Sequence, residues 1–99
     1  MKFKNSEKLY KKGLVNLVGA VNSPVRAFAS VGGTPLFIKK AKGSKIIDVD
    51  DNEYIDFVLS YGPMILGHRN KIVENEVKNA LKKGTTFGAT TKGEIKMAQ

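Results

Sequence analysis

A long stretch with almost no charge, broken repeatedly by glycine and proline, most constrains what this chain can fold into. It covers residues 13–38, and Arg26 is its only charged residue. The stretch has neither a sustained helical period nor a clean strand alternation. Gly19, Pro24 and Pro35 interrupt it further. Because the stretch is apolar, we expect an ordered, partly buried loop here.

Regular elements are expected before and after this loop. The sequence predicts a short helix over residues 6–12, with Ser6 as its N-cap and Gly13 as its stop. After the loop, three runs of apolar and β-branched residues predict a small antiparallel sheet. The predicted strands cover residues 36–38, 45–49 and 53–57, and the turns between them cover residues 41–44 and 50–52.

A second uncharged, glycine-punctuated stretch covers residues 59–68 and is followed by a helical pattern over residues 71–83. Asn70 is placed to cap that helix and Gly84 to stop it. Thr91 to Glu94 fits a capping box, which predicts the start of a further helix. The sequence ends soon after that start, which we interpret as a truncated domain.

Composition narrows the class of protein. The chain has 99 residues, a net charge of +8 and no cysteine, so disulfides, thiol catalysis and cysteine–zinc sites are excluded. No apolar run is long enough for a membrane span, and the first residues lack the apolar core of a cleaved signal, so a cytoplasmic protein is expected. Nearly all the cations are lysines scattered among acids, without any nucleic-acid-binding motif. We therefore expect a solvated basic surface and no specific nucleic-acid partner.

Arg26 is the most informative single residue, because a guanidinium in an apolar segment needs a partner when it is buried. A carboxylate would satisfy its two-pronged donor geometry, and that carboxylate belongs either to an internal acid or to a ligand. The residues alone do not favour either. Residues 48–52 begin like a calcium loop, but Glu53 and Leu59 stand where glycine and glutamate are needed, so a hairpin turn is predicted and no metal site.

Two other residues have a plain and a functional interpretation. His68 lies just before a helix with no second histidine to build a site, so helix capping is the expected role. Tyr61 lies beside Gly62 and Pro63, where it could line a pocket, but core packing is the more common role. No lysine stands in a setting that would desolvate it, as a Schiff-base lysine requires.

Three blocks of sequence together resemble a known family. They are Val21–Phe28 (VNSPVRAF), Val31–Ile38 (VGGTPLFI) and Tyr54–His68 (YIDFVLSYGPMILGH). Their order and spacing resemble the N-terminal part of the glutamate-1-semialdehyde aminomutases, a family of pyridoxal-phosphate enzymes related to the class III aminotransferases. The resemblance runs from about Ser6 to the end of the chain and includes residues 84–89.

The resemblance implies an activity and a site. Members of this family convert glutamate-1-semialdehyde to 5-aminolevulinate in tetrapyrrole (porphyrin) biosynthesis, using pyridoxal 5'-phosphate and its pyridoxamine form. By resemblance, Arg26 binds the substrate carboxylate, Ser23 places a hydroxyl beside the substrate, and Tyr61 lines the active site. A homodimer and an interaction with glutamyl-tRNA reductase are also implied for the full-length parent. The family usually has tryptophan where Tyr61 stands, which puts the packing there in question.

The resemblance also sets the expected fold class, an α+β fragment that forms the N-terminal part of a fold type I pyridoxal-phosphate transferase with an α/β parent. Residues 1–58 would belong to the small domain and residues 59–99 to the approach to the large domain. The family's Schiff-base lysine would fall downstream of residue 99, so the isolated chain is expected to be inactive. The alternatives are a fragment of another class III aminotransferase and a free-standing small basic binding domain.

Overall fold

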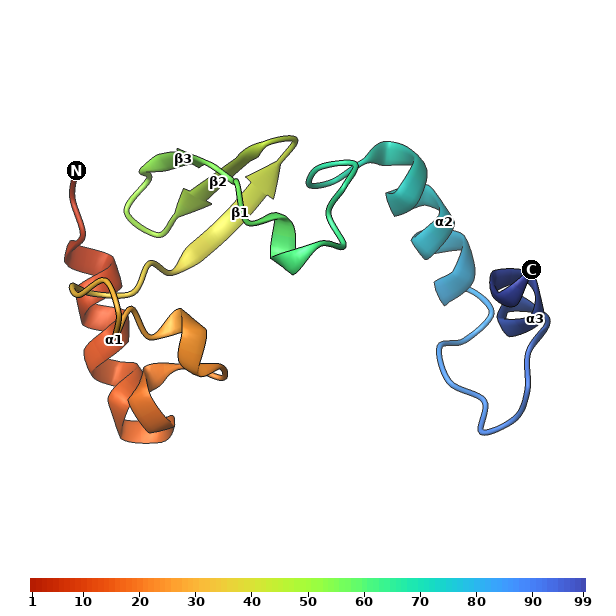
Figure 1. Cartoon of the computed structure of the whole chain (residues 1–99), viewed down its shortest axis with the longest axis horizontal. Coiled ribbons are helices and arrows are strands. Elements are labelled where there is room, and N and C mark those ends of the chain that lie inside the picture. Colours follow the sequence, from red (N-terminus) through yellow and green to blue (C-terminus); the bar gives the residue numbers. More distant parts are fainter. The chain divides into compact units, whose positions relative to one another are not determined.

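The structure is a computed structural model that describes all 99 residues, and it divides into two compact units, Met1–Arg69 and Asn70–Gln99. The first unit holds helix α1 (Lys4–Asn16) and a sheet of strands β1 (Ile38–Lys42), β2 (Lys45–Asp48) and β3 (Glu53–Ile55). The second unit holds helices α2 (Lys71–Leu81) and α3 (Lys92–Ala98), as labelled in Figure 1. None of these helices is both long and apolar enough to cross a membrane.

The sheet is antiparallel in the order β1–β2–β3. The predicted first strand over residues 36–38 and turn over residues 41–44 are wrong: β1 shares only Ile38 with that prediction, and Lys42 pairs with Lys45, so the turn contains only Gly43 and Ser44. Strands β2 and β3 begin where predicted and end one and two residues before the predicted ends. Gly43 adopts a φ of +58°, a conformation that glycine reaches without steric cost. The register shifts between Ile38 and Lys40, as expected for a β-bulge.

The turn between β2 and β3 is built around Asp48, which is fully buried. Its Oδ1 accepts the backbone N–H groups of Asp50 and Asn52, each at 2.9 Å. Its Oδ2 accepts hydrogen bonds from the side-chain amide of Asn52 at 2.8 Å and from the hydroxyl of Tyr54 at 2.9 Å. The predicted hairpin turn over residues 50–52 is confirmed, with Asp51 at a φ of +68°.

Helix α1 is longer than the predicted helix over residues 6–12, and its predicted cap and stop are wrong. Ser6 lies inside the helix and is buried. The carboxylate of Asp50 instead accepts the backbone N–H groups of Asn5 at 2.7 Å and Ser6 at 2.8 Å, which supplies the acceptor that the first turn needs. Gly13 lies inside the helix at a point where the chain returns close to it: a Cβ at Gly13 would meet the Cβ of Ala20 at 2.9 Å.

The loop expected over residues 13–38 is only partly as predicted. After α1 it contains two short 3₁₀ turns, Val18–Ala20 and Pro24–Arg26. Most of its apolar side chains are exposed, but Ala20 and Pro35 are buried and Phe28, Leu36 and Phe37 are half-buried. The expected partial burial is therefore confirmed.

In the second unit, the local signals act as predicted. The Asn70 side chain caps α2 by accepting the N–H groups of Ile72 at 3.0 Å and Val73 at 3.3 Å. The Thr91 and Glu94 side chains form the predicted capping box of α3. Helix α2 ends at Leu81, two residues before the predicted end, and neither helix buries a side chain.

Candidate functional site

Two of the three predicted site residues share one turn. Ser23 is extended, with a φ of −148°, and Pro24 begins the 3₁₀ turn Pro24–Arg26 because its fixed φ suits a first helical position. The Arg26 N–H donates to the Ser23 carbonyl at 3.0 Å, and the Ala27 N–H donates to the Pro24 carbonyl at 3.1 Å. This short turn therefore holds Ser23 and Arg26 at a fixed spacing.

The Arg26 side chain has no partner within the chain. It is exposed, and it forms neither a hydrogen bond nor an ion pair with any of the acids. Ser23 is half-buried, and its hydroxyl does not cap the turn. Of the two alternatives for Arg26, the internal acid is therefore absent here. The guanidinium fork is free to receive a carboxylate from outside this chain.

Tyr61 lies on a different turn, Leu59–Tyr61, and makes no hydrogen bond to the Ser23–Arg26 turn. Its side chain is 73% exposed, so the core-packing interpretation is wrong within this chain. Leu59, Ser60 and Tyr61 all adopt positive φ values, of 50°, 54° and 64°. For side chains with a Cβ this left-handed conformation costs roughly 1–2 kcal/mol per residue. The tyrosine is thus presented on a strained turn.

Asp56, which was not among the predicted site residues, holds the start of this strained turn. Its Oδ1 accepts the N–H groups of Val58 at 2.9 Å and Leu59 at 3.1 Å. Its Oδ2 lies 2.6 Å from Nε2 of His68. An aspartate just before a glycine-punctuated loop favours the amide contacts, so that part of its role had a sequence signal. The pairing with His68 had none.

The expected capping role of His68 is therefore wrong. Asn70 caps α2, whereas the His68 side chain pairs with Asp56 across the base of the loop. The hydrogen bond from His68 is the largest cause that holds the pKa of Asp56 below its ordinary value, and the Leu59 and Val58 amides add to it. No group of three or more histidine, aspartate or glutamate side chains gathers to hold a metal.

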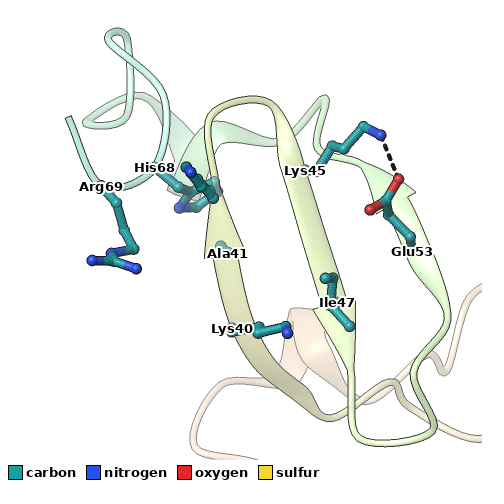
Figure 2. A pocket seen from close by; sticks show the side chains of 8 residues that line it. Lys40, Ala41, Lys45, Ile47, Glu53, His68 and Arg69 are labelled. Atoms are coloured by element: carbon teal, nitrogen blue, oxygen red, sulfur yellow. Dashed lines mark hydrogen bonds and ion pairs between the residues drawn. The ribbon is translucent and has the colours of Figure 1, made fainter.

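A hollow of about 580 Å³ lies over one part of the sheet, and Figure 2 shows its lining. The Lys45 ammonium and the Glu53 carboxylate pair across neighbouring strands at 2.5 Å. In the same view His68 and Arg69 lie beside β1, on the opposite side of the sheet from Glu53. Ser23, Arg26 and Tyr61 do not line it, so the predicted site residues lie elsewhere. The complete lining is Lys40, Ala41, Lys42, Lys45, Ile47, Glu53, His68 and Arg69.

Comparison with known proteins decides the family. The sequence model described as aminotransferase class-III matches residues 28–99, which is well over half of the chain. The chain belongs to the class-III aminotransferase family. The predicted relation of this chain to that family is confirmed.

Curated relatives match the class-III chain over nearly all its residues. It is 62% identical over 98 residues to the glutamate-1-semialdehyde 2,1-aminomutase of Thermodesulfovibrio yellowstonii, covering 99% of this chain and 23% of that protein. It is 57% identical over 99 residues to the protein of the same name from Persephonella marina, covering 100% of this chain and again 23% of that protein. The chain thus spans about a quarter of the length of the curated relatives it matches.

Solved structures confirm the predicted fold class. A transaminase described with PLP bound aligns with a TM-score of 0.83 at 28% identity, covering 97% of this chain and 22% of its own. A glutamate-1-semialdehyde aminomutase from Pseudomonas aeruginosa PAO1 aligns with a TM-score of 0.82 at 21% identity, covering 95% of this chain and 20% of its own. The fold of this chain therefore matches one segment of each of these two proteins.

Proposed function

We propose that this class-III chain forms part of a glutamate-1-semialdehyde 2,1-aminomutase, which converts glutamate-1-semialdehyde to 5-aminolevulinate. The observation that carries the proposal is the 62% identity to a protein of that name over nearly the whole chain. The unpaired Arg26 supports it, because this substrate carries a carboxylate that needs a cationic partner.

In this proposal, Arg26 binds the substrate carboxylate through its guanidinium fork, and Ser23 places its hydroxyl beside the substrate. Tyr61 supplies an aromatic wall, and its high exposure within this chain leaves its ring available for contact. A fixed carboxylate orients the rest of the substrate toward the reacting centre, which is how a positioning group contributes to rate.

The cofactor would be pyridoxal 5'-phosphate and its pyridoxamine form, which supply the chemistry of amino-group transfer. A Schiff-base lysine needs burial to become nucleophilic, and every lysine of this chain is exposed. The residues of this chain therefore do not fit the anchoring of that cofactor. We place the anchoring lysine in the remainder of the full-length protein, and we propose the isolated chain to be inactive.

We extend the proposal to the domain boundary, with residues 1–58 in the small domain and residues 59–99 leading toward the large one. A homodimer and an interaction with glutamyl-tRNA reductase rest on the family resemblance alone. Sedimentation of the full-length protein, with and without the reductase, tests both.

The proposed activity is best tested in a hybrid enzyme, in which this chain replaces the matching segment of the Thermodesulfovibrio yellowstonii aminomutase. We expect the hybrid to form 5-aminolevulinate from glutamate-1-semialdehyde. Arg26→Ala should raise KM about 100-fold, which corresponds to about 2.7 kcal/mol, because the substrate carboxylate loses its partner. Steady-state kinetics measure this change.

Two variants control for charge and geometry. Arg26→Lys keeps the charge but loses the two-pronged donor geometry, so its KM should lie between that of the unmodified hybrid and that of Arg26→Ala. Lys8→Ala removes an exposed cation from α1 and should leave KM within twofold. A folded, cofactor-loaded hybrid without aminomutase activity would contradict the proposed function. An unchanged KM in Arg26→Ala would remove Arg26 from the site.

A further inference from the structure

The loop that carries Tyr61 begins at Asp56 and ends at His68, and these two side chains meet at its base. Both side chains are largely enclosed, with 7% of the Asp56 side chain and 16% of the His68 side chain exposed. Asp56 Oδ2 lies 2.6 Å from His68 Nε2. One carboxylate thus joins two points of the chain that lie twelve residues apart.

The same carboxylate also reaches into the loop. Its second oxygen accepts the N–H groups of Val58 and Leu59, and Leu59 is the first residue of the left-handed turn. Asp56 therefore fixes the entry to the turn with one oxygen and the exit of the loop with the other.

Both ends of the loop are also fixed to the β1–β2 turn. The His68 N–H donates to the Gly43 carbonyl and the Gly43 N–H donates to the His68 carbonyl, each at 2.8 Å. The Asp56 N–H donates to the Ser44 carbonyl at 2.8 Å. Gly67 allows this close approach, since a Cβ there would meet the Gly43 oxygen at 2.9 Å. Backbone hydrogen bonds to the β1–β2 turn thus fix both ends of the loop to the sheet.

The loop itself needs such support. Three consecutive residues, Leu59 to Tyr61, hold positive φ values, and backbone strain of this kind persists only where surrounding contacts impose it. The loop side chains make few contacts of their own: Val58, Tyr61 and Ile65 are all more than half exposed. Backbone hydrogen bonds from Tyr61 to Val58, and from Gly62 and Met64 to Leu59, close the turn itself. The base contacts anchor the two ends of the loop that carries it.

We infer that Asp56 and His68 act as positioning residues, which together hold the Leu59–Tyr61 turn in its left-handed form and so fix the Tyr61 ring for substrate. This inference rests on the proposed function, because that proposal places Tyr61 at the substrate. Asp56 and His68 themselves touch neither substrate nor cofactor; they act through the turn.

The test combines amide hydrogen exchange with kinetics in the cofactor-loaded hybrid enzyme. Asp56→Asn keeps the shape of the side chain but removes its charge. We expect it to speed exchange of the residue 58–61 amides at least tenfold and to lower kcat/KM about tenfold. Asp51→Asn is the matched control, because it makes the same chemical change at an exposed carboxylate in the hairpin turn. It should leave both measurements within twofold.

A second pair of variants tests the other partner. His68→Ala removes the contact with Asp56 and should reproduce the effect of Asp56→Asn. His68→Gln keeps a donor that can reach the carboxylate, so it should recover most of kcat/KM. Recovery by glutamine distinguishes positioning from a general loss of folding, and it remains measurable if an Asp56 variant folds poorly.

The outcomes separate the two proposals. Unchanged exchange at residues 58–61 in both Asp56→Asn and His68→Ala would show that the Asp56–His68 pair does not hold the turn. Faster exchange with an unchanged kcat/KM would overturn the positioning role of the pair. If the hybrid folds, loads cofactor and lacks aminomutase activity, the proposed function fails, whereas the exchange result still reports on whether the pair holds the turn.

Discussion

At the scale of single residues, Asp48 shows how this fold keeps a buried charge without a cation. The carboxylate is fully enclosed, yet its hydrogen-bond partners are two backbone amides, one side-chain amide and one phenol. Burial acts to raise the pKa of Asp48, but the hydrogen bonds from Asn52, Tyr54 and Asp50 outweigh it and lower the pKa. The same neutral hydrogen-bond donors thus stabilise the Asp48 carboxylate and hold the turn in place.

Removing this carboxylate should open the hairpin. We expect Asp48→Ala to lower the opening free energy of the residue 45–55 amides by about 2–4 kcal/mol, because several buried donors lose their acceptor together. Hydrogen exchange in the hybrid enzyme measures the change. Asp51→Asn, at the exposed tip of the same turn, should have almost no effect. Equal effects of the two variants would show that Asp48 does not organise the turn.

The same residues give the hairpin a defined dependence on pH. Asp48, Asp50 and Asp56 have pKa values lowered from an ordinary value of 3.8. For Asp50, the Asn5 and Ser6 amides outweigh the raising effect of burial. The unfolded chain then binds more protons in acid, so their stabilisation is present above pH 3.8 and is lost as the pH falls through the lower folded values.

Tyr54 sets the alkaline limit of the pH range over which the hairpin is stable. Burial, followed by its hydrogen bond to Asp48, raises its pKa above 10.0, so its contribution is present below pH 10 and is lost as the pH rises through the folded value. We expect exchange protection of residues 45–55, corrected for intrinsic rates, to be flat from pH 5 to 9 and to fall below about pH 4. A loss of protection already at pH 6 would contradict this assignment.

At the scale of elements, the sequence predicts best where the signal and its partner are close together. Asn70 and Thr91 act on amides two or three residues away, and both caps are confirmed. Helix α1 is mispredicted because its acceptor, Asp50, lies 44 and 45 residues from the amides it binds. The pairing of Asp56 with His68 was missed for the same reason: nothing local marks it.

The glycine inside helix α1 is likewise explained by a contact outside the helix. An alanine normally stabilises a helix by about 1 kcal/mol relative to glycine. At Gly13 the new methyl group would lie 2.9 Å from the Cβ of Ala20, and overpacking of that kind costs about 1–3 kcal/mol. We therefore expect Gly13→Ala to destabilise α1, with amide exchange in residues 4–16 as the measurement. Gly93→Ala in α3 is the control, since its nearest contact is an ordinary 3.7 Å, and it should be neutral or stabilising.

At the scale of the whole molecule, the chain carries more apolar surface than it can bury by itself. Ala20 is the only hydrophobic side chain in its buried core, whereas Val18, Phe57 and Ile65 are more than 80% exposed. The apolar loop over residues 13–38, expected to be partly buried, is buried only in part within this chain. Apolar character predicted that the stretches would be covered, but it carries no information on whether the covering surface belongs to the same segment.

We accordingly expect the isolated chain to lack a cooperative unfolding transition and to bind a hydrophobic dye strongly. Differential scanning calorimetry and dye fluorescence measure this, and the hybrid enzyme is the reference in which the same residues are covered. A sharp calorimetric transition without dye binding would show that the segment is stable alone. In either case the capping contacts of α2 and α3 should persist, because each joins residues only two or three positions apart.

The strained turn has a consequence for how this protein could be improved. At position 60, selection for a higher melting temperature would favour glycine, whereas selection for the proposed activity would favour the native Ser60. A glycine there would relieve the left-handed backbone, but it would also free the turn to leave the conformation that presents the neighbouring aromatic ring. A screen that scores heat resistance alone would therefore select Ser60→Gly, although this variant no longer fixes the position of the Tyr61 ring.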